Sequence, residues 1–388
     1  MNTHDMHRKS WRTMMAGLMS LTLMLPQNAT AQGLSAGEAR KAADALKTEW
    51  LQKTKAKYES VEEEKCLKTG GLTMPFKYVR YGTKPADGYS LFISLHGGGS
   101  APADVNDGQW YNQVYLYKSD SGIFLSPRAP YDDWDMWFKP ALDECYQKLI
   151  EMAVATLDVN PDKVYIMGYS AGGDGVWRMA TRMADTWAAA SMMAGHPGNV
   201  SLLNLRNLPF MNWCGEFDYA YNRNRENVER GVELDSLQIT DPEGYIHETH
   251  IVRGKPHWMD RVDTAAVKWM EQYRRNPYPR KIVWRQEEVV RPHFYWLSAP
   301  KDELEKGKTV RLELNGNKVE ITQCDYSSLT LYFNDEMVNL DKSIEIRYKD
   351  KVLFSGKLPR TKENLRGTLQ ERGDYRYMFP AAVSLSAL

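Results

Sequence analysis

Residues 168–172 read Gly-Tyr-Ser-Ala-Gly, a Gly-x-Ser-x-Gly motif. An apolar stretch, 163–167, comes directly before the motif, and an amphipathic stretch begins at Gly173. We therefore expect a strand, a sharp turn that exposes the Ser170 hydroxyl, and a helix whose N-terminus favours developing negative charge. This setting predicts nucleophilic acyl transfer by Ser170. An ordinary glycine-rich turn with a solvated serine is the alternative.

A serine hydroxyl needs a base to remove its proton, and that base is usually a histidine. In the architecture that the motif suggests, the chain order is serine, acid, histidine. His257 satisfies this order because it follows a predicted strand, 245–252, at the sheet edge where ligands bind. We therefore predict His257 as the base. Six other histidines fit less well. His4 and His7 lie in an N-terminal leader, His196 comes too early, and His293 lies beyond a linker. His247 and His250 fall inside the strand, where we expect structural roles.

The acid that orients the imidazole should follow the intervening strand. Residues 209–214 read as this strand, and Gly-Glu-Phe-Asp follows directly. Asp218 is the predicted acid and Glu216 is its rival. Asp218 could also cap the next predicted helix, which would not exclude the catalytic role.

Two backbone N–H groups should stabilise the oxyanion of the tetrahedral intermediate. One is that of Ala171, directly after the nucleophile. The other is expected from Gly97 or Gly98, in the loop His-Gly-Gly-Gly-Ser that follows the predicted strand 90–95. Glycines let the backbone approach a substrate carbonyl without a side-chain clash. A phosphate cradle is disfavoured, because no Lys-Ser/Thr pair follows the loop.

The chain between residues 73 and 275 alternates strand and helix patterns, which predicts an α/β fold with a mainly parallel sheet covered by helices. Expected strands are 74–81, 90–95, 122–126, 163–167, 188–193, 209–214 and 245–252, and expected helices are 140–157, 172–183, 219–234 and 264–273. Beyond the proline-containing linker 274–279, helical patterns vanish. Short strands there predict a small all-β domain, a sandwich, over 278–388, with its first strand at 281–290.

The N-terminal part divides into two segments. Residues 1–31 have a basic start, a short apolar run and an Ala-Thr-Ala site, and so predict a secretory signal peptide. Residues 32–72 form an N-terminal segment with a helix over 35–65, begun by a Ser35–Glu38 capping box. The predicted domains are therefore 1–31, 32–72, 73–277 and 278–388.

The composition of the chain argues against some classes of binding partner. The 388 residues carry 50 basic and 50 acidic side chains, so no charge excess indicates nucleic acid or an anionic membrane. No stretch after the leader is long and apolar enough to span a bilayer, and we expect a secreted or periplasmic protein. The four cysteines are expected to be mainly free and buried, although one disulfide bridge is possible. Because no Cys-x-x-Cys spacing occurs, no metal site is predicted, and no cofactor is predicted either.

Residues 95–99, 168–173, Gly215 with Asp218, and the turn Pro256-His257 resemble the α/β-hydrolase superfamily. More narrowly, they are similar to secreted esterases grouped with poly(3-hydroxybutyrate) depolymerases and feruloyl or acetyl-xylan esterases. The resemblance covers about residues 70 to 275. It implies a serine carboxylesterase with Ser170, Asp218 and His257 as its triad, and it implies no particular ester.

Two aromatic clusters are expected at the substrate edge. Trp110 and Tyr111 follow the glycine loop, and Trp134 and Trp137 follow the predicted strand 122–126. Aromatic rings there could stack on a sugar or a phenolic acyl group, or could simply pack the loops. The leading hypothesis is a secreted esterase acting on a carbohydrate or polyester, with a polysaccharide-linked ester as substrate. A serine peptidase of the same fold and a non-catalytic glycan-binding protein are the alternatives.

Overall fold

The computed structural model describes residues 33–386, and from Leu34 onward the chain forms one compact unit. The predicted signal peptide lies outside the described residues. The boundary predicted near residue 278 remains a prediction, because the chain on either side of it belongs to this same unit. No helix within residues 33–386 combines the length and apolarity that a bilayer crossing requires.

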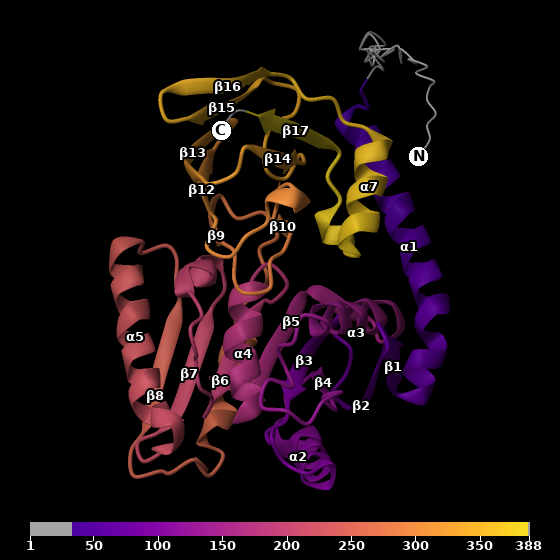
Figure 1. The fold of residues 1–388 in the computed structure, drawn as a ribbon. Coiled ribbons are helices and arrows are strands. Elements are labelled where there is room, and N and C mark those ends of the chain that lie inside the picture. Colours follow the sequence, from indigo (N-terminus) through magenta and orange to yellow (C-terminus); the bar gives the residue numbers. More distant parts are fainter. Residues whose placement is uncertain (1–32, 387–388) are drawn as a thin grey trace, which may run out of the picture. The chain divides into compact units, whose positions relative to one another are not determined.

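The largest sheet in the described part has eight strands, in the order β1-β2-β4-β3-β5-β6-β7-β8 (Figure 1). From β4 to β8 neighbouring strands run parallel, whereas β2 is antiparallel to both β1 and β4. The strands are β1 Cys66–Thr69, β2 Leu72–Tyr81, β3 Tyr89–Leu95, β4 Gly122–Pro127, β5 Val159–Tyr169, β6 Ala189–Met193, β7 Phe210–Gly215 and β8 His247–Val252.

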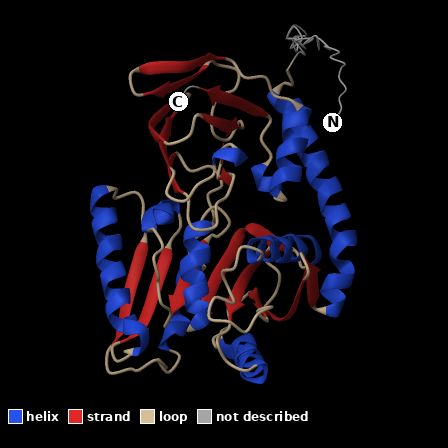
Figure 2. Cartoon of the chain, viewed as in Figure 1, coloured by secondary structure: helices blue, strands red, loops and turns tan. Residues whose placement is uncertain are grey.

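Helices cover both faces of this sheet (Figure 2). On β3, Leu91, Ile93 and Leu95 belong to one apolar core while Phe92 belongs to a second, as the alternation of side chains along a strand requires. The first core receives side chains from α3, α4 and α5, and the second from α6 and the end of α2. This double cover explains the unbroken apolar runs in the sequence. The helices are α2 Ala103–Leu116, α3 Leu142–Thr156, α4 Ala171–Arg182, α5 Arg223–Thr240 and α6 Ala265–Met270.

The C-terminal part contains two further sheets, with orders β10-β11-β14-β17 and β16-β15-β13-β12-β9. Their apolar side chains share one core, and the rings of Trp284 on β9 and Phe294 on β10 stack 5.8 Å apart. The strands are β9 Lys281–Arg285, β10 His293–Phe294, β11 Leu297–Ser298, β12 Thr309–Asn315, β13 Lys318–Cys324, β14 Ser328–Phe333, β15 Ile344–Tyr348, β16 Lys351–Gly356 and β17 Ala381–Ser386.

Two helices correct the sequence-based expectations. Helix α7, Lys362–Arg372, interrupts the region expected to be all-β, and α2 had not been predicted. In both helices polar residues dominate and few side chains are buried, so no apolar period is visible. The predicted strand 281–290 is also too long, since β9 ends at Arg285.

Helix α1, Ala36–Glu64, begins with the expected capping box, in which Glu38 accepts from the Ser35 backbone and donates its own N–H to the Ser35 hydroxyl. It packs on α3 through a 2.9 Å hydrogen bond from the Tyr58 hydroxyl to Glu151. It also reaches the segment after α7, where Trp50 meets Tyr375 edge to face at 5.9 Å. All four cysteines are free thiols; Cys66 is half-buried and the other three are buried.

Candidate active site

Ser170 sits on the sharp turn between β5 and α4. Its backbone has φ 57° and ψ −122°, a conformation that is costly for a residue with a side chain. The turn closes only because its flanks are glycines: a Cβ on Gly168 would lie 2.4 Å from the Gly172 carbonyl oxygen, and one on Gly172 would lie 2.1 Å from that of Leu95. Strand, strained serine and helix therefore adopt the arrangement that presents a nucleophile at the sheet edge.

The Ser170 hydroxyl, His257 and Asp218 form a continuous hydrogen-bonded chain. Ser170 Oγ lies 2.9 Å from His257 Nε2, and His257 Nδ1 lies 2.7 Å from Asp218 Oδ2. Asp218 is 2% exposed, whereas the His257 side chain is 42% exposed. This arrangement allows the imidazole to take the serine proton while the buried carboxylate holds its tautomer and orientation.

The loop that carries His257 is fastened to the end of β5, the strand directly before Ser170. The Tyr169 hydroxyl donates to the His257 carbonyl oxygen at 2.6 Å and accepts from the Met259 N–H at 3.1 Å. Glu216, the rival of Asp218, accepts from the Gly254 N–H at 2.7 Å and so ties the loop after β7 to the loop after β8. The structure thus brings Asp218, and not Glu216, to the imidazole.

We expect Tyr169→Phe to lower kcat/KM for a model ester about tenfold, because it removes two hydrogen bonds that fix the position of His257. The matched control is Tyr165→Phe on the same strand, which removes a 2.9 Å hydrogen bond to the Tyr273 carbonyl oxygen. Steady-state kinetics and urea unfolding of both variants test this. If Tyr169→Phe and Tyr165→Phe lose the same amount of stability and have the same activity, a positioning role for Tyr169 is contradicted.

The loop after β3 lies against the nucleophile. A Cβ on Gly97 would be 3.2 Å from Ser170 Cβ, and one on Gly99 would be 3.5 Å from Ala171 Cβ. The Gly99 N–H donates to Asn106 Oδ1 at 2.9 Å, which leaves the N–H groups of Gly97 and Gly98, with that of Ala171, as the candidate oxyanion donors. Gly98 has φ +104° and no room for a Cβ, so only glycine fits there.

His96 holds this loop in place. Its Nε2 accepts from the Ala129 N–H at 3.1 Å, so the proton is on Nδ1, which lies 2.6 Å from the Gly97 carbonyl oxygen. The Trp137 indole donates to the His96 carbonyl oxygen at 2.8 Å. Burial of the imidazole lowers the pKa of His96 to about 4.

This pKa predicts a loss of stability in mild acid. In the unfolded chain the pKa returns to about 6.5, so between about pH 6.5 and pH 4 the unfolded state binds more protons than the folded state. The free energy of unfolding should therefore fall by up to about 3 kcal/mol as the pH drops through this window, and should not depend on His96 above it. Urea unfolding at several pH values measures this. His96→Gln should make the dependence shallower without abolishing it, because burial also lowers the pKa of His293 and that of His196. His250→Gln, in a half-exposed histidine, should leave it steep.

A cavity of about 290 Å³ lies beside Ser170, next to the proposed oxyanion donors. Sequence reasoning had missed most of its polar lining. Asp174 and Arg178 follow Ser170 at intervals of four, which places all three on one side of the elbow and α4, and this spacing could have revealed them. The full lining is Gly98, Gly99, Ser100, Trp134, Phe138, Ala171, Asp174, Arg178, His196, Tyr221 and Arg223.

Polar groups of opposite sign line this cavity. Asp174 accepts from the His196 N–H at 2.6 Å, and burial raises the pKa of Asp174. Arg223 is 8% exposed and has no hydrogen-bond partner at Nε. One of its terminal nitrogens lies 3.9 Å from Asp218 Oδ1, which is also unpartnered. The cavity therefore offers both donors and acceptors, with two guanidinium groups, those of Arg178 and Arg223, against the one carboxylate of Asp174.

Of the four aromatic residues predicted to contact substrate, only Trp134 lines this cavity. Trp137 is fully buried and hydrogen-bonded to the glycine loop, so a direct substrate contact is wrong for it. Trp110 donates to the Ser126 carbonyl oxygen at 2.8 Å and thereby fastens α2 to β4. Tyr111 is exposed on α2 and packs edge to face on Tyr115.

His247 and His250 are used locally. His247 Nδ1 lies 2.8 Å from the Tyr245 carbonyl oxygen, and the His250 ring stacks on Trp213 at 4.1 Å. Within the described residues, no group of three or more His, Cys, Asp or Glu side chains is arranged to hold a metal ion.

The sheet order, the serine on its strand–turn–helix and the histidine loop after the last strand together define the α/β-hydrolase fold. The site contains the groups of a serine hydrolase within this fold.

The similarity of this chain to known proteins is distant. No family model matches the chain, and no curated protein matches it. Similar solved structures include a thermostable esterase (19% identity, 54% of this chain and 62% of the esterase, TM-score 0.41). Others are the fluorophosphonate-binding serine hydrolase F of Staphylococcus aureus (11%, 53% and 96%, 0.40) and an acylaminoacyl peptidase of Pyrococcus horikoshii (12%, 54% and 41%, 0.40). The chain thus spans less than two thirds of the esterase.

Proposed function

We propose that the protein is a serine carboxylic ester hydrolase with Ser170, His257 and Asp218 as its catalytic triad. The observation that carries this proposal is the unbroken relay from Ser170 Oγ through the imidazole to a buried carboxylate. A purely structural hydrogen-bond network would not require a serine in strained backbone geometry, directly before a residue, Ala171, that lines a cavity.

The reaction would proceed in two acyl transfers. His257 takes the Ser170 proton as Oγ attacks the ester carbonyl carbon, and the oxyanion is stabilised by the Ala171 N–H and that of Gly97 or Gly98. The imidazolium then protonates the departing alcohol as its C–O bond breaks, leaving an acyl group on Oγ. Water, deprotonated by His257, attacks this acyl group and releases the acid.

We further propose that the ester is attached to a carbohydrate, which is the substrate class of the feruloyl and acetyl-xylan esterases that the motifs resemble. Large aromatic side chains that line the cavity or are near the triad in sequence are exposed: Trp134 61%, Phe217 46%, Tyr219 67%, Tyr221 76% and Trp258 45%. Exposed aromatic rings can stack on sugar rings, and the mixed donors and acceptors beside Ser170 suit hydroxyl groups. The sequence features of a leader support export to the periplasm or the exterior.

Hydrolysis of short-chain p-nitrophenyl esters, acetylated xylan and feruloylated arabinose by the purified protein tests this function. A p-nitroanilide of the same acyl group separates an esterase from a peptidase. We expect a fluorophosphonate to label Ser170, as identified by mass spectrometry of the peptide. Absence of both labelling and ester hydrolysis would refute the proposal, and faster anilide than ester cleavage would favour the peptidase.

A further inference from the structure

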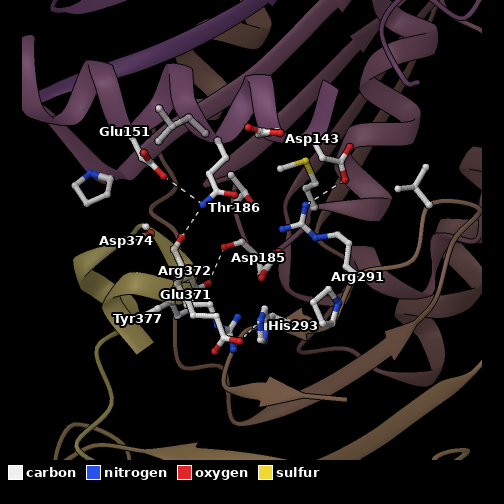
Figure 3. A pocket seen from close by; sticks show the side chains of 18 of the residues that line it. Asp143, Glu151, Asp185, Thr186, Arg291, His293, Glu371, Arg372, Asp374 and Tyr377 are labelled. Atoms are coloured by element: carbon white, nitrogen blue, oxygen red, sulfur yellow. Dashed lines mark hydrogen bonds and ion pairs between the residues drawn. The ribbon is translucent and has the colours of Figure 1, made fainter. Parts of the chain in front are cut away.

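A second cavity, of about 490 Å³, lies where α3, α7 and the segment 289–293 meet (Figure 3). We call it the α3–α7 cavity. Helix α1 contributes Trp50, the segment after α4 contributes Asp185, and α7 and the turn after it contribute residues 371–375. It shares no lining residue with the cavity beside Ser170. Its volume is within the usual range for small-molecule sites.

Polar side chains in this cavity have atoms without partners. Asp185 is 4% exposed, and its Oδ2 accepts from the Tyr295 N–H at 3.3 Å, but its Oδ1 has no hydrogen bond. The Nε atoms of Arg291 and Arg372 and the Nδ1 atom of His293 are also buried and unpartnered. Arg291 and His293 share the segment 289–293, whereas Asp185 follows α4 and Arg372 ends α7, and in Figure 3 these side chains surround the same space. Because an unpaired buried polar atom costs about 1–3 kcal/mol, such a cluster indicates a site that a polar ligand completes.

The charges of the lining favour a neutral ligand. Six carboxylates and four cationic side chains line the cavity, so a free anion would meet an excess of acid. Several of the carboxylates are already neutralised: Asp143 pairs with Arg182 at 2.5 Å and Arg291 at 3.3 Å, and Asp374 with Arg275 at 2.8 Å. The ligand therefore need not supply net charge, but it must supply both donors and acceptors.

Hydroxyl groups meet this requirement because each can donate and accept. A ligand hydroxyl could donate to the Asp185 carboxylate while neighbouring hydroxyls accept from the guanidinium groups of Arg291 and Arg372, since all three residues line the cavity. Aromatic residues, among them Trp50 and Tyr375, also line the cavity and offer the apolar surface on which sugar rings pack.

We propose that the α3–α7 cavity binds a neutral saccharide unit, at a site separate from the triad. This inference does not depend on the proposed esterase activity. If both hold, the second site would hold the enzyme on a glycan while the cavity beside Ser170 acts on an ester.

Saturation-transfer NMR on the full chain tests the proposal with xylobiose and cellobiose as neutral probes, and with glucuronate and glucosamine as charged ones. Asp185→Asn is the decisive variant, because its amide can still accept from the Tyr295 N–H while a donor replaces the unpartnered acceptor. Asp350→Asn makes the same chemical change in an exposed turn and serves as the control. We expect a neutral disaccharide to bind, its affinity to fall about tenfold or more in Asp185→Asn, and no change in Asp350→Asn.

Binding should persist after Ser170 has been labelled with a fluorophosphonate, and in the unmodified protein the ligand should slow hydrogen exchange in segments 183–186 and 371–377. The exchange measurement decides the matter even if Asp185→Asn does not fold. The proposal is overturned if only the charged probes bind, or if neither neutral disaccharide binds. It is also overturned if binding is lost when Ser170 is labelled, or if the ligand slows hydrogen exchange only in the loops around Ser170. Ester hydrolysis is measured separately, so none of these outcomes decides whether the protein is an esterase.

Discussion

Replacing Ser170 with alanine should lower kcat for p-nitrophenyl acetate by at least about 10⁴-fold, and by as much as about 10⁶-fold. The variant keeps the histidine, the acid and the oxyanion donors, but it lacks the atom that forms the acyl-enzyme. The remaining rate would come from water attacking a carbonyl polarised by the backbone N–H groups. Steady-state kinetics, with a burst measurement on the unmodified protein, would record the loss.

The fold should survive this change. Alanine retains the Cβ that the turn already accommodates at φ 57°, and only the hydrogen bond to His257 is lost. Ser236→Ala, in an exposed residue of α5, is the matched control and should retain full activity. A Ser170→Ala enzyme with normal spectra and more than about a tenth of the original kcat would show that another group performs the attack.

Local sequence patterns were sufficient to place Ser170 because everything that positions it is adjacent in the chain: an apolar strand, two glycines without room for a Cβ, and an amphipathic helix. The central sheet was predictable for a related reason. Strands covered on both faces are apolar throughout, and β3, β4, β6 and β7 are buried along their whole length.

Features that depend on tertiary packing could not be read in this way. Trp134 and Trp137 are three residues apart in one aromatic loop, yet the first is 61% exposed and the second is fully buried. Helix α7 has a polar sequence with only three buried side chains, so its period is too weak to see. The α3–α7 cavity collects residues from α1, α3 and α7, which no local pattern associates.

The identity of the acid was also beyond local pattern, because Glu216 and Asp218 both follow β7 within a few residues. The structure separates them: Asp218 Oδ2 lies 2.7 Å from His257 Nδ1, whereas Glu216 bonds the Gly254 N–H. Asp218→Asn should therefore lower kcat about 10⁴-fold, since an amide can stabilise neither the imidazolium nor the required tautomer. Glu216→Gln keeps an oxygen for the Gly254 N–H and should stay within about threefold of the original rate.

The pair of variants is informative because both exchange a carboxylate for its isosteric amide, on one loop and two residues apart. Asp218 is 2% exposed and Arg223 lies beside it, so the loss of its charge would also leave a buried guanidinium without its ion-pair partner. Urea unfolding must therefore accompany the kinetics, and Asp218→Asn should be compared with the unmodified protein below the onset of its own unfolding transition. If Glu216→Gln were the inactive variant and Asp218→Asn the active one, the carboxylate that supports His257 during turnover would be Glu216, and the loops after β7 and β8 would have to rearrange when substrate binds.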